Sequence, residues 1–504
     1  MIGPSIDRPR AEAYIHNAAA AFAFIEDNSE VQYEPLAHVV DYFSRVPGAK
    51  NGIRTLGALP YDGRRLGSHF KRIRSPLAIG MIFGGMAIGR EDLPHLLDVT
   101  RSPRSAAHVT RMLLRHGRDR LSGYPRGTRM VMGNALIGRL AATLLERKVP
   151  IWLNTSALEL TTDSGRVTGA VVRCGSGTRR VVCRRAVVLA NGSFSGSPEM
   201  RQRYFAHVRA GKPHRSHVPS SSDGSGILLA AACGGAVDEQ VTEPGAWTPV
   251  SLVPMRDGST AAFSHFGDRA KPGVIVVNRA GRRFANEAIN YHDFLMAMFA
   301  ECAGDREVEA FVVTSHRHLR KYGLGRVPAF PGRYKPFVRS GYLMYGRTIA
   351  ELARKIGVDP RALEQTIARF NEQAARGMDP EFHKGETTFE QAAGDPEVTP
   401  NPCVAPLDVG PWYAIRMMPG DIGTLLGVRV DPAARVLDAD GEPIPSLYAV
   451  GTVAVSIMRG TYPAAGAMLG PALTFGYLAV QDILAAAEPA SGGQLREPRE
   501  ASRV

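Results

Sequence analysis

Two short apolar runs, each ending at a turn of small residues, constrain the fold of this chain most. Residues 186–190 lead into Asn191, Gly192 and Ser193, and residues 447–451 lead into Thr452. A continuous apolar run of this length, stopped by a small-residue turn, is typical of a strand buried on both faces of a parallel sheet. Ligands of open α/β sheets bind at the carboxyl ends of such strands. The chain is therefore predicted to be an α/β protein with a ligand near these two turns.

Composition and charge narrow the class of function. The chain has 504 residues, of which 44% are hydrophobic and 22% charged; this excludes collagen, a coiled coil and wholesale disorder. The net charge is +13, but the basic residues are spread along the chain, so we predict a solvated basic surface and no nucleic-acid partner. The five cysteines fit no zinc pattern, so no metal site is predicted. No transmembrane segment or signal peptide is expected, and we predict a cytoplasmic protein.

Hydrophobic periodicity and turn residues predict the remaining elements. Helices are expected at residues 10–28, 93–121 (as a pair), 133–147 and 470–487, and across most of 293–371. Strands are expected at residues 151–154, 157–161, 167–173, 180–183 and 274–277. Residues 376–410 are expected to form a loop. Residues 488–504 are expected to be a disordered polar tail.

Residues 447–479 carry the clearest local signal for a binding site. A strand ends at Gly451, a loop rich in Gly and Ala follows, and Gly470-Pro471 marks the start of a helix. Glycines let the backbone approach a flat ligand closely, and a helix N-terminus offers N–H donors to an electron-rich group. Plain turns are the alternative for any one of these glycines.

A set of motifs in a fixed order gives the chain a family resemblance. They are DGRRLG at 62–67, GTRMVMGNALIGRL at 127–140, DSGRVTGAVV at 163–172, AVVLANGSF at 186–194, DGSGILLA at 223–230, KPGVIVVNRAGRRFANEAINY at 271–291, NPC at 401–403, PGDIGT at 419–424 and TYPAAG at 461–466. In this order, from about residue 35 to 480, the chain resembles the flavin-dependent 3-ketosteroid dehydrogenases of the fumarate-reductase-like flavoprotein superfamily.

The resemblance implies FAD as the cofactor. The residues that match the family's cofactor contacts fall in five short segments of the chain. They are Ser156 and Ala157 on the adenine side, Ala190, Asn191, Gly192 and Ser193, then Asp223, Gly224 and Gly226 along the dinucleotide, and Gly451, Thr452, Ala467 and Leu469 beside the ribityl chain and the isoalloxazine. The chain departs from the family's usual Thr-Gly-Gly, because it has Asn191, Gly192 and Ser193 at that turn.

The resemblance also implies a catalytic set. Formation of a C1–C2 double bond beside a 3-keto group needs a polarised carbonyl, a base for the C2 proton, and a hydride acceptor, which is flavin N5. Tyr462 and Gly466 match the family's pair that binds the keto oxygen, and Tyr291 matches its proton-abstracting tyrosine. A tyrosine with its ordinary pKa near 10 is a poor base at neutral pH, so a second tyrosine must help, and Tyr42 is the match. Packed tyrosines are the alternative, and for Tyr42, where the family's Asp-Tyr-x-Pro pattern is only partly present, the packed tyrosine is the favoured interpretation.

A neutral site lined by tyrosines suits a flat apolar ketone, such as a steroid, better than the dianion of a fumarate reductase, which needs Arg and His. A quinone or another acceptor would take the electrons. Three alternatives stay open: a 4-ene-forming 5α-steroid dehydrogenase, an enoate reductase, and an inactive form that holds no FAD.

The expected fold is a Rossmann-like FAD-binding domain, formed by residues 1–268 and 425–487, with an inserted α+β catalytic domain at 269–424. The family begins with a strand, a G-x-G-x-x-G turn and a helix that hold the pyrophosphate. The first 100 residues contain no such fingerprint, so the N-terminal βαβ unit is expected to be missing. Either the working protein begins further upstream, or the chain is a truncated form that binds FAD poorly.

Overall fold

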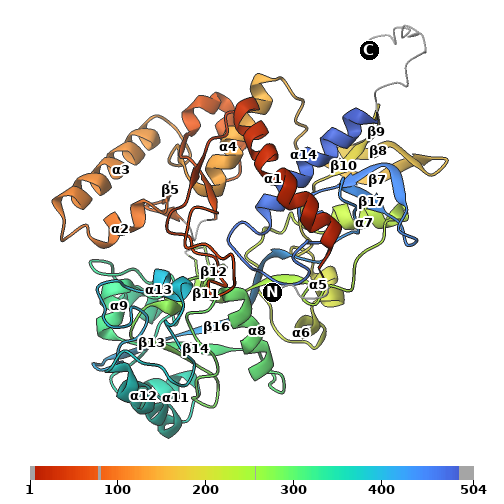
Figure 1. The fold of residues 1–504 in the computed structure, drawn as a ribbon. Coiled ribbons are helices and arrows are strands. Elements are labelled where there is room, and N and C mark those ends of the chain that lie inside the picture. The colour runs from red at the N-terminus through yellow and green to blue at the C-terminus, as the bar shows by residue number, and fades with distance from the viewer. Residues whose placement is uncertain (1–5, 78–80, 256, 487–504) are drawn as a thin grey trace, which may run out of the picture.

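The computed structural model describes residues 6–77, 81–255 and 257–486 (Figure 1). The helices are α1 (Arg8–Asn28), α2 (Asp92–Leu97), α3 (Pro103–Leu121), α4 (Met132–Glu146), α5 (Pro198–Tyr204), α6 (Ala206–Arg209), α7 (Ser225–Ala232), α8 (Tyr291–Glu301), α9 (His316–Tyr322), α10 (Lys335–Arg339), α11 (Ile349–Ile356), α12 (Pro360–Ala374), α13 (Thr388–Ala393) and α14 (Leu469–Ala485). Short 3₁₀ helices are η2 (Gly63–Arg72), η4 (Asp268–Ala270) and η5 (Gly451–Val453).

Within the described residues, the strands form six separate sheets. They are β1 (Tyr33–Pro35), β2 (Leu56–Ala58), β3 (Tyr61–Asp62), β4 (Met81–Ile82), β5 (Met86–Ala87), β6 (Arg129–Met130), β7 (Thr155–Asp163), β8 (Arg166–Cys174), β9 (Gly177–Val182), β10 (Val187–Leu189), β11 (Gly245–Pro254), β12 (Thr260–Ser264), β13 (Val274–Val277), β14 (Ala310–Ser315), β15 (Met344–Gly346), β16 (Trp412–Thr424), β17 (Arg435–Leu437) and β18 (Pro443–Ala449).

The largest sheet has the strand order β12–β11–β16–β14–β13, with β15 beside β16. Its central strand, β16, pairs antiparallel with β11 and with β14. Every residue of β13 and of β14 is buried, as a continuous apolar run predicts. Helix α8 packs against β11, and α11 packs on α12 at the lower end of the molecule (Figure 1). Because β11 and β12 belong to it, this sheet extends across the boundary predicted after residue 268.

The two apolar runs supply β10 and the end of β18 in a small sheet with the strand order β10–β18–β17. β10 and β18 run parallel, with Val188 opposite Tyr448. Burial on both faces is confirmed for β18, where Leu447, Tyr448 and Ala449 are all buried. It is wrong for β10, because Val188 is 40% exposed. Among the described residues, β10 has a partner strand on one side only.

Most local predictions are confirmed. The pair α2–α3, the helices α1 and α4, and the hairpin β7–β8 lie where the sequence predicts them. The strand predicted at residues 151–154 is wrong: no described strand pairs with this segment, and Ile151, Trp152 and Leu153 are about half exposed. The helical and loop predictions for 293–371 and 376–410 missed β14, β15 and α13. Residues 487–504, which include the predicted tail, lie outside the described residues. No helix in the described ranges is long and apolar enough to cross a bilayer.

Candidate active site

Three tyrosines that are far apart in the sequence meet in one cluster. Tyr42 and Tyr291 have their hydroxyl oxygens 3.2 Å apart in a hydrogen bond. The ring centroid of Tyr462 lies 5.5 Å from that of Tyr291 and 6.2 Å from that of Tyr42. Tyr291 and Tyr462 are buried, and Tyr42 is half-buried. The structure therefore brings together all three tyrosines for which the sequence predicts catalytic roles.

Local structure positions each ring. Tyr291 is the first residue of α8, whose N-cap, Asn290, accepts a hydrogen bond from the Asp293 N–H through its side chain at 2.9 Å. Tyr462 follows a turn at Gly460 (φ 93°), where a Cβ would lie 2.3 Å from Thr242 Oγ1. Only glycine fits this turn, because a side chain there would collide with Thr242.

Tyr42 reaches the cluster from an N-terminal loop that contacts α13. Ser44 Oγ accepts a hydrogen bond from the Phe389 N–H at 3.2 Å, and Arg45 forms an ion pair with Glu386. The ring of Phe389 lies 4.8 Å from that of Tyr42. The loop is thus held to residues near the end of the predicted catalytic segment.

Gly466 stands four residues after Tyr462. Its φ is 86°, and no described atom lies within 4 Å of the place where a Cβ would be. The backbone at Gly466 is therefore exposed on the side that a side chain would otherwise cover. This residue and Tyr462 belong to one short loop, four residues apart.

Burial controls the electrostatics of the cluster. It raises the pKa of Tyr291 well above its ordinary value, the pKa of Tyr42 to about 12, and the pKa of Tyr462. The hydrogen bond between Tyr42 and Tyr291 lowers the pKa of Tyr42 and adds to the increase at Tyr291. The positive charge of Arg90 also lowers the pKa of Tyr42. Within the hydrogen-bonded pair, a negative charge is therefore more stable on Tyr42 than on Tyr291.

Three of the segments predicted to hold the cofactor lie close together, namely the turn at 191–193, the segment 223–226 and η5. The Gly224 N–H donates to the Ser193 carbonyl at 3.1 Å. A Cβ on Gly226 would lie 2.9 Å from Asn191 Oδ1 and 3.0 Å from Val453 of η5. The glycine thus allows α7 to approach both strand-end turns closely.

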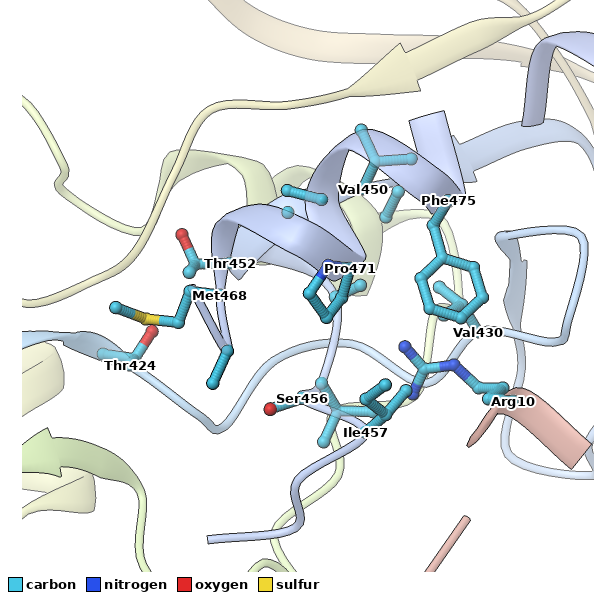
Figure 2. A pocket seen from close by; sticks show the side chains of 16 residues that line it. Arg10, Thr424, Val430, Val450, Thr452, Ser456, Ile457, Met468, Pro471 and Phe475 are labelled. Atoms are coloured by element: carbon cyan, nitrogen blue, oxygen red, sulfur yellow. The ribbon is translucent and has the colours of Figure 1, made fainter. Parts of the chain in front are cut away.

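The remaining predicted cofactor residues lie around and beyond this convergence. Thr452, Ala467 and Met468 line a small crevice of about 30 Å³ between η5 and the start of α14 (Figure 2). Leu469, the first residue of α14, is exposed. Ser156 and Ala157 lie at the start of β7, in a different sheet, against which α7 packs. The adenine-side residues therefore lie in a separate sheet that contacts the helix carrying Gly226.

Buried hydroxyl groups test whether these residues fit a dinucleotide. Ser193 Oγ, Ser195 Oγ and Thr424 Oγ1 are buried and have no hydrogen-bond partner in the part of the chain that the structure describes. Leaving a buried polar group unpaired costs about 1–3 kcal/mol. Ser193 lies at the strand-end turn, and Thr424 lines the crevice. Donors placed along the predicted cofactor path fit a ligand rich in acceptor oxygens and nitrogens, as FAD is.

Sequence reasoning missed three side chains that complete the cluster. Phe389 packs on Tyr42, Phe266 meets Tyr291 edge-on with ring centroids 4.9 Å apart, and His292 stacks on Tyr462. Phe266 and Phe389 come from segments without a recognisable motif. His292 had one available signal, its position directly after a predicted catalytic residue.

Comparison with known proteins also indicates an FAD-binding oxidoreductase. A family model described as an FAD binding domain matches residues 3–469. The 4-oxocyclohex-2-ene-1-carboxylate 5-dehydrogenase of Sinomonas cyclohexanicum is 36% identical over 482 residues, which cover 95% of this chain and 81% of that protein. The 3-oxosteroid 1-dehydrogenase of Mycolicibacterium smegmatis is 31% identical and matches 98% of this chain and 86% of its own length.

A solved structure matches the fold over nearly the whole chain. The 3-ketosteroid Δ1-dehydrogenase of Sterolibacterium denitrificans, in complex with 1,4-androstadiene-3,17-dione, superposes with a TM-score of 0.86 at 34% identity, covering 95% of this chain and 86% of that one. The predicted flavoprotein fold of mixed helices and sheets is therefore confirmed. This chain belongs to the FAD binding domain family and, within it, to the flavin-dependent oxidoreductases that include the 3-oxosteroid 1-dehydrogenases.

Proposed function

We propose that the chain catalyses the 1,2-dehydrogenation of a 3-ketosteroid. The observation that carries this proposal is the meeting of Tyr42, Tyr291 and Tyr462 beside the open backbone of Gly466. A cluster of uncharged aromatic hydroxyls, walled by Phe266 and Phe389, suits a flat apolar ketone.

Each residue has a role that follows from its place. Tyr462 O–H and the Gly466 N–H hold the keto oxygen, which makes the C2 proton acidic. The relay starts from the Tyr42 phenolate, whose negative charge Arg90 stabilises. The C2 proton then passes to Tyr291 as the proton of Tyr291 moves across the 3.2 Å hydrogen bond to that phenolate, which becomes a neutral phenol. Bound FAD supplies the acceptor for the C1 hydride. The electrons then leave for an external acceptor, for which a quinone is our proposal.

The cofactor would be held by Ser193, Gly224, Gly226, Thr452 and Ala467, with Ser156 and Ala157 on the adenine side. The division into a flavin-binding part (1–268 and 425–487) and a catalytic part (269–424) remains our proposal. In it, β11 and β12 contribute to the catalytic sheet from the N-terminal side.

We also propose that a further βαβ segment completes the sheet β10–β18–β17. Support comes from the unpaired side of β10 among the described strands and from the exposed apolar side chains of Val188, Ile151, Trp152 and Leu153. An apolar face of this kind is typical of a surface that another element covers. A stoichiometric flavin spectrum of the purified chain would contradict this part of the proposal and exclude the inactive form. An upstream sequence encoding G-x-G-x-x-G would support it.

A second candidate reaction has its own support. The relative at 36% identity is a dehydrogenase of a monocyclic oxo-carboxylate, and the charge of Arg90 acts on the cluster through Tyr42. A small ring ketone bearing a carboxylate would bring a negative charge that this arginine could meet. The 4-ene-forming and enoate-reducing reactions have no comparable observation in their favour.

Anaerobic bleaching of the bound flavin distinguishes these reactions. We expect a 4-ene-3-ketosteroid to bleach the flavin and succinate to leave it oxidised. Bleaching by 4-oxocyclohex-2-ene-1-carboxylate alone would replace the steroid with the second candidate. No bleaching by either ketone in a flavin-loaded preparation would refute both.

A further inference from the structure

His292 joins the two tyrosines that flank the proposed substrate. It is the second residue of α8, directly after Tyr291, and it is 2% exposed. Its ring lies nearly parallel to that of Tyr462, with an angle of 26° and centroids 6.3 Å apart. The side chain therefore fills the space between the helix that carries Tyr291 and the loop that carries Tyr462.

The ring of His292 has two backbone partners. Nδ1 accepts a hydrogen bond from the Trp247 N–H of β11 at 3.1 Å, and the ring also hydrogen-bonds to the backbone of Gly460. Burial lowers the pKa of His292 to about 4, so the ring is neutral at pH 7. A neutral imidazole has one acceptor and one donor. The acceptor faces Trp247, which leaves the donor for Gly460.

The loop before Tyr462 is fixed on its other side by different contacts. Thr242 Oγ1 donates to the Arg459 carbonyl at 2.8 Å, and Gly460 lies so close to residues 242 and 243 that a Cβ would collide with both. These contacts tie the loop to the segment before β11. His292 ties the same loop, through Gly460, to α8 and hence to Tyr291.

We propose that His292 is a positioning residue that sets the distance between Tyr462 and Tyr291 by linking Trp247, Gly460 and α8. It does not need to touch the substrate, since it acts through the loop that holds Tyr462. This inference deepens the proposed function, and only its kinetic test rests on that function.

The test compares variants that keep or lose the two hydrogen bonds. His292→Phe keeps a flat ring and loses both bonds, whereas His292→Gln keeps one acceptor and one donor. His318→Phe is the matched control, because His318 is also buried, its pKa is also lowered to about 4, and its Nδ1 pairs with the Pro272 carbonyl away from the tyrosines. His292→Asn, which keeps a donor and an acceptor on a shorter side chain, replaces His292→Phe if that variant does not fold.

Two readouts decide the outcome. In the purified chain, without ligand, we expect amide exchange in residues 456–462 to be at least about tenfold faster in His292→Phe, and to return toward the native rate in His292→Gln. In flavin-loaded enzyme we expect kcat to fall about 10- to 100-fold with KM changed less than about threefold, below the full loss of an oxyanion-site donor.

Native exchange in His292→Phe, or equally fast exchange in His292→Gln and His292→Phe, would overturn the proposal. An equal effect of His318→Phe on residues 456–462 would also overturn it. Because exchange is measured without substrate, it decides the positioning role even if the steroid is not turned over. If the native chain shows normal exchange but does not turn over the steroid, the result counts against the proposed function. The positioning role of His292 is then judged from the exchange data alone.

Discussion

The six-stranded sheet and the sheet β10–β18–β17 differ in how completely they are covered. In the six-stranded sheet, β13 and β14 are buried along their whole length, and strands pair with both sides of β16. In the sheet β10–β18–β17, Val188 is 40% exposed, and segment 151–153 also carries exposed apolar side chains and pairs with no described strand. The six-stranded sheet is therefore closed at its centre, whereas the sheet β10–β18–β17 leaves an apolar side chain of β10 exposed.

The tyrosine cluster and the sheet β10–β18–β17 therefore depend on different contacts. The tyrosine cluster depends on contacts between segments that the chain itself supplies, from the loop at Tyr42 to α8 and the loop at Tyr462. The flavin sheet depends on whatever covers β10. Substitutions in the first region should thus affect folding and chemistry directly, while substitutions in the second should matter only when its open face is occupied.

The largest expected effect is on the buried ion network of the catalytic part. Arg283 pairs with Glu287 at 2.8 Å and with Asp379 at 2.7 Å, and all three side chains are buried. Arg283→Met leaves two buried carboxylates with Lys384 as the nearby cation, and we expect a loss of about 3–5 kcal/mol in the free energy of unfolding. Urea denaturation measures it.

The matched control lies in the flavin-binding part. Arg203 pairs with Glu239 at 3.0 Å, and both side chains are more than half exposed. Arg203→Met should change the free energy of unfolding by less than about 1 kcal/mol. Equal losses in the two variants would mean that the contrast between the two regions does not hold.

Tyr462→Phe should give the next largest effect, on chemistry alone. Loss of the hydroxyl removes one of the two donors proposed for the keto oxygen, and we expect kcat/KM to fall about 10²–10³-fold with the flavin spectrum unchanged. Tyr413→Phe is the control, because Tyr413 is also buried but hydrogen-bonds to His316 instead of joining the cluster. Unchanged steroid turnover by Tyr462→Phe would refute the assignment of this residue.

Acid should weaken the fold through its buried histidines. Burial lowers the pKa of His207 to about 3 and the pKa values of His292 and His318 to about 4, from an ordinary value of 6.5. As the pH falls below 6.5, the unfolded chain takes up protons that the folded chain does not, so the free energy of unfolding falls until the folded-state values are reached. For His292 alone we expect a loss of about 2 kcal/mol between pH 7 and pH 5.

Urea denaturation at pH 7 and pH 5 measures this loss. His292→Gln should show a shallower dependence, because it lacks the titrating group. A free energy of unfolding that stays constant or rises toward pH 5 would show that these histidines do not limit stability.

The sequence predicted elements and motifs better than it predicted neighbours. The helices α1 and α4, the hairpin β7–β8 and the converging glycines at 192, 224 and 226 follow from local patterns. β16 was not predicted, because Pro419, Gly420 and Gly423 interrupt its strand pattern and its stability comes from pairing with β11 and β14. Phe266, Phe389 and His292 joined the site through contacts between remote segments, which no local spacing records.

The exposure of residues 151–154 also shows this limit of prediction from local patterns. Their apolar pattern predicts a strand, yet an apolar run forms one only when a neighbouring strand accepts its backbone hydrogen bonds. The pattern thus predicts the conformation that the segment would adopt if another strand paired with it. The structure shows its conformation without such a partner among the described strands.

The smallest expected effect, at Trp152, tests that interpretation. Trp152 is 55% exposed, so Trp152→Ser should change the free energy of unfolding by less than about 0.5 kcal/mol in the chain alone. If a βαβ segment carrying G-x-G-x-x-G is fused upstream and covers this face, the same substitution should cost about 2–3 kcal/mol, because the side chain becomes buried. Tryptophan fluorescence reports the change, since Trp247 and Trp412 are already buried. An emission maximum that does not shift to shorter wavelength on fusion, together with an unchanged cost of Trp152→Ser, would mean that the open face of the flavin sheet binds something other than such a segment.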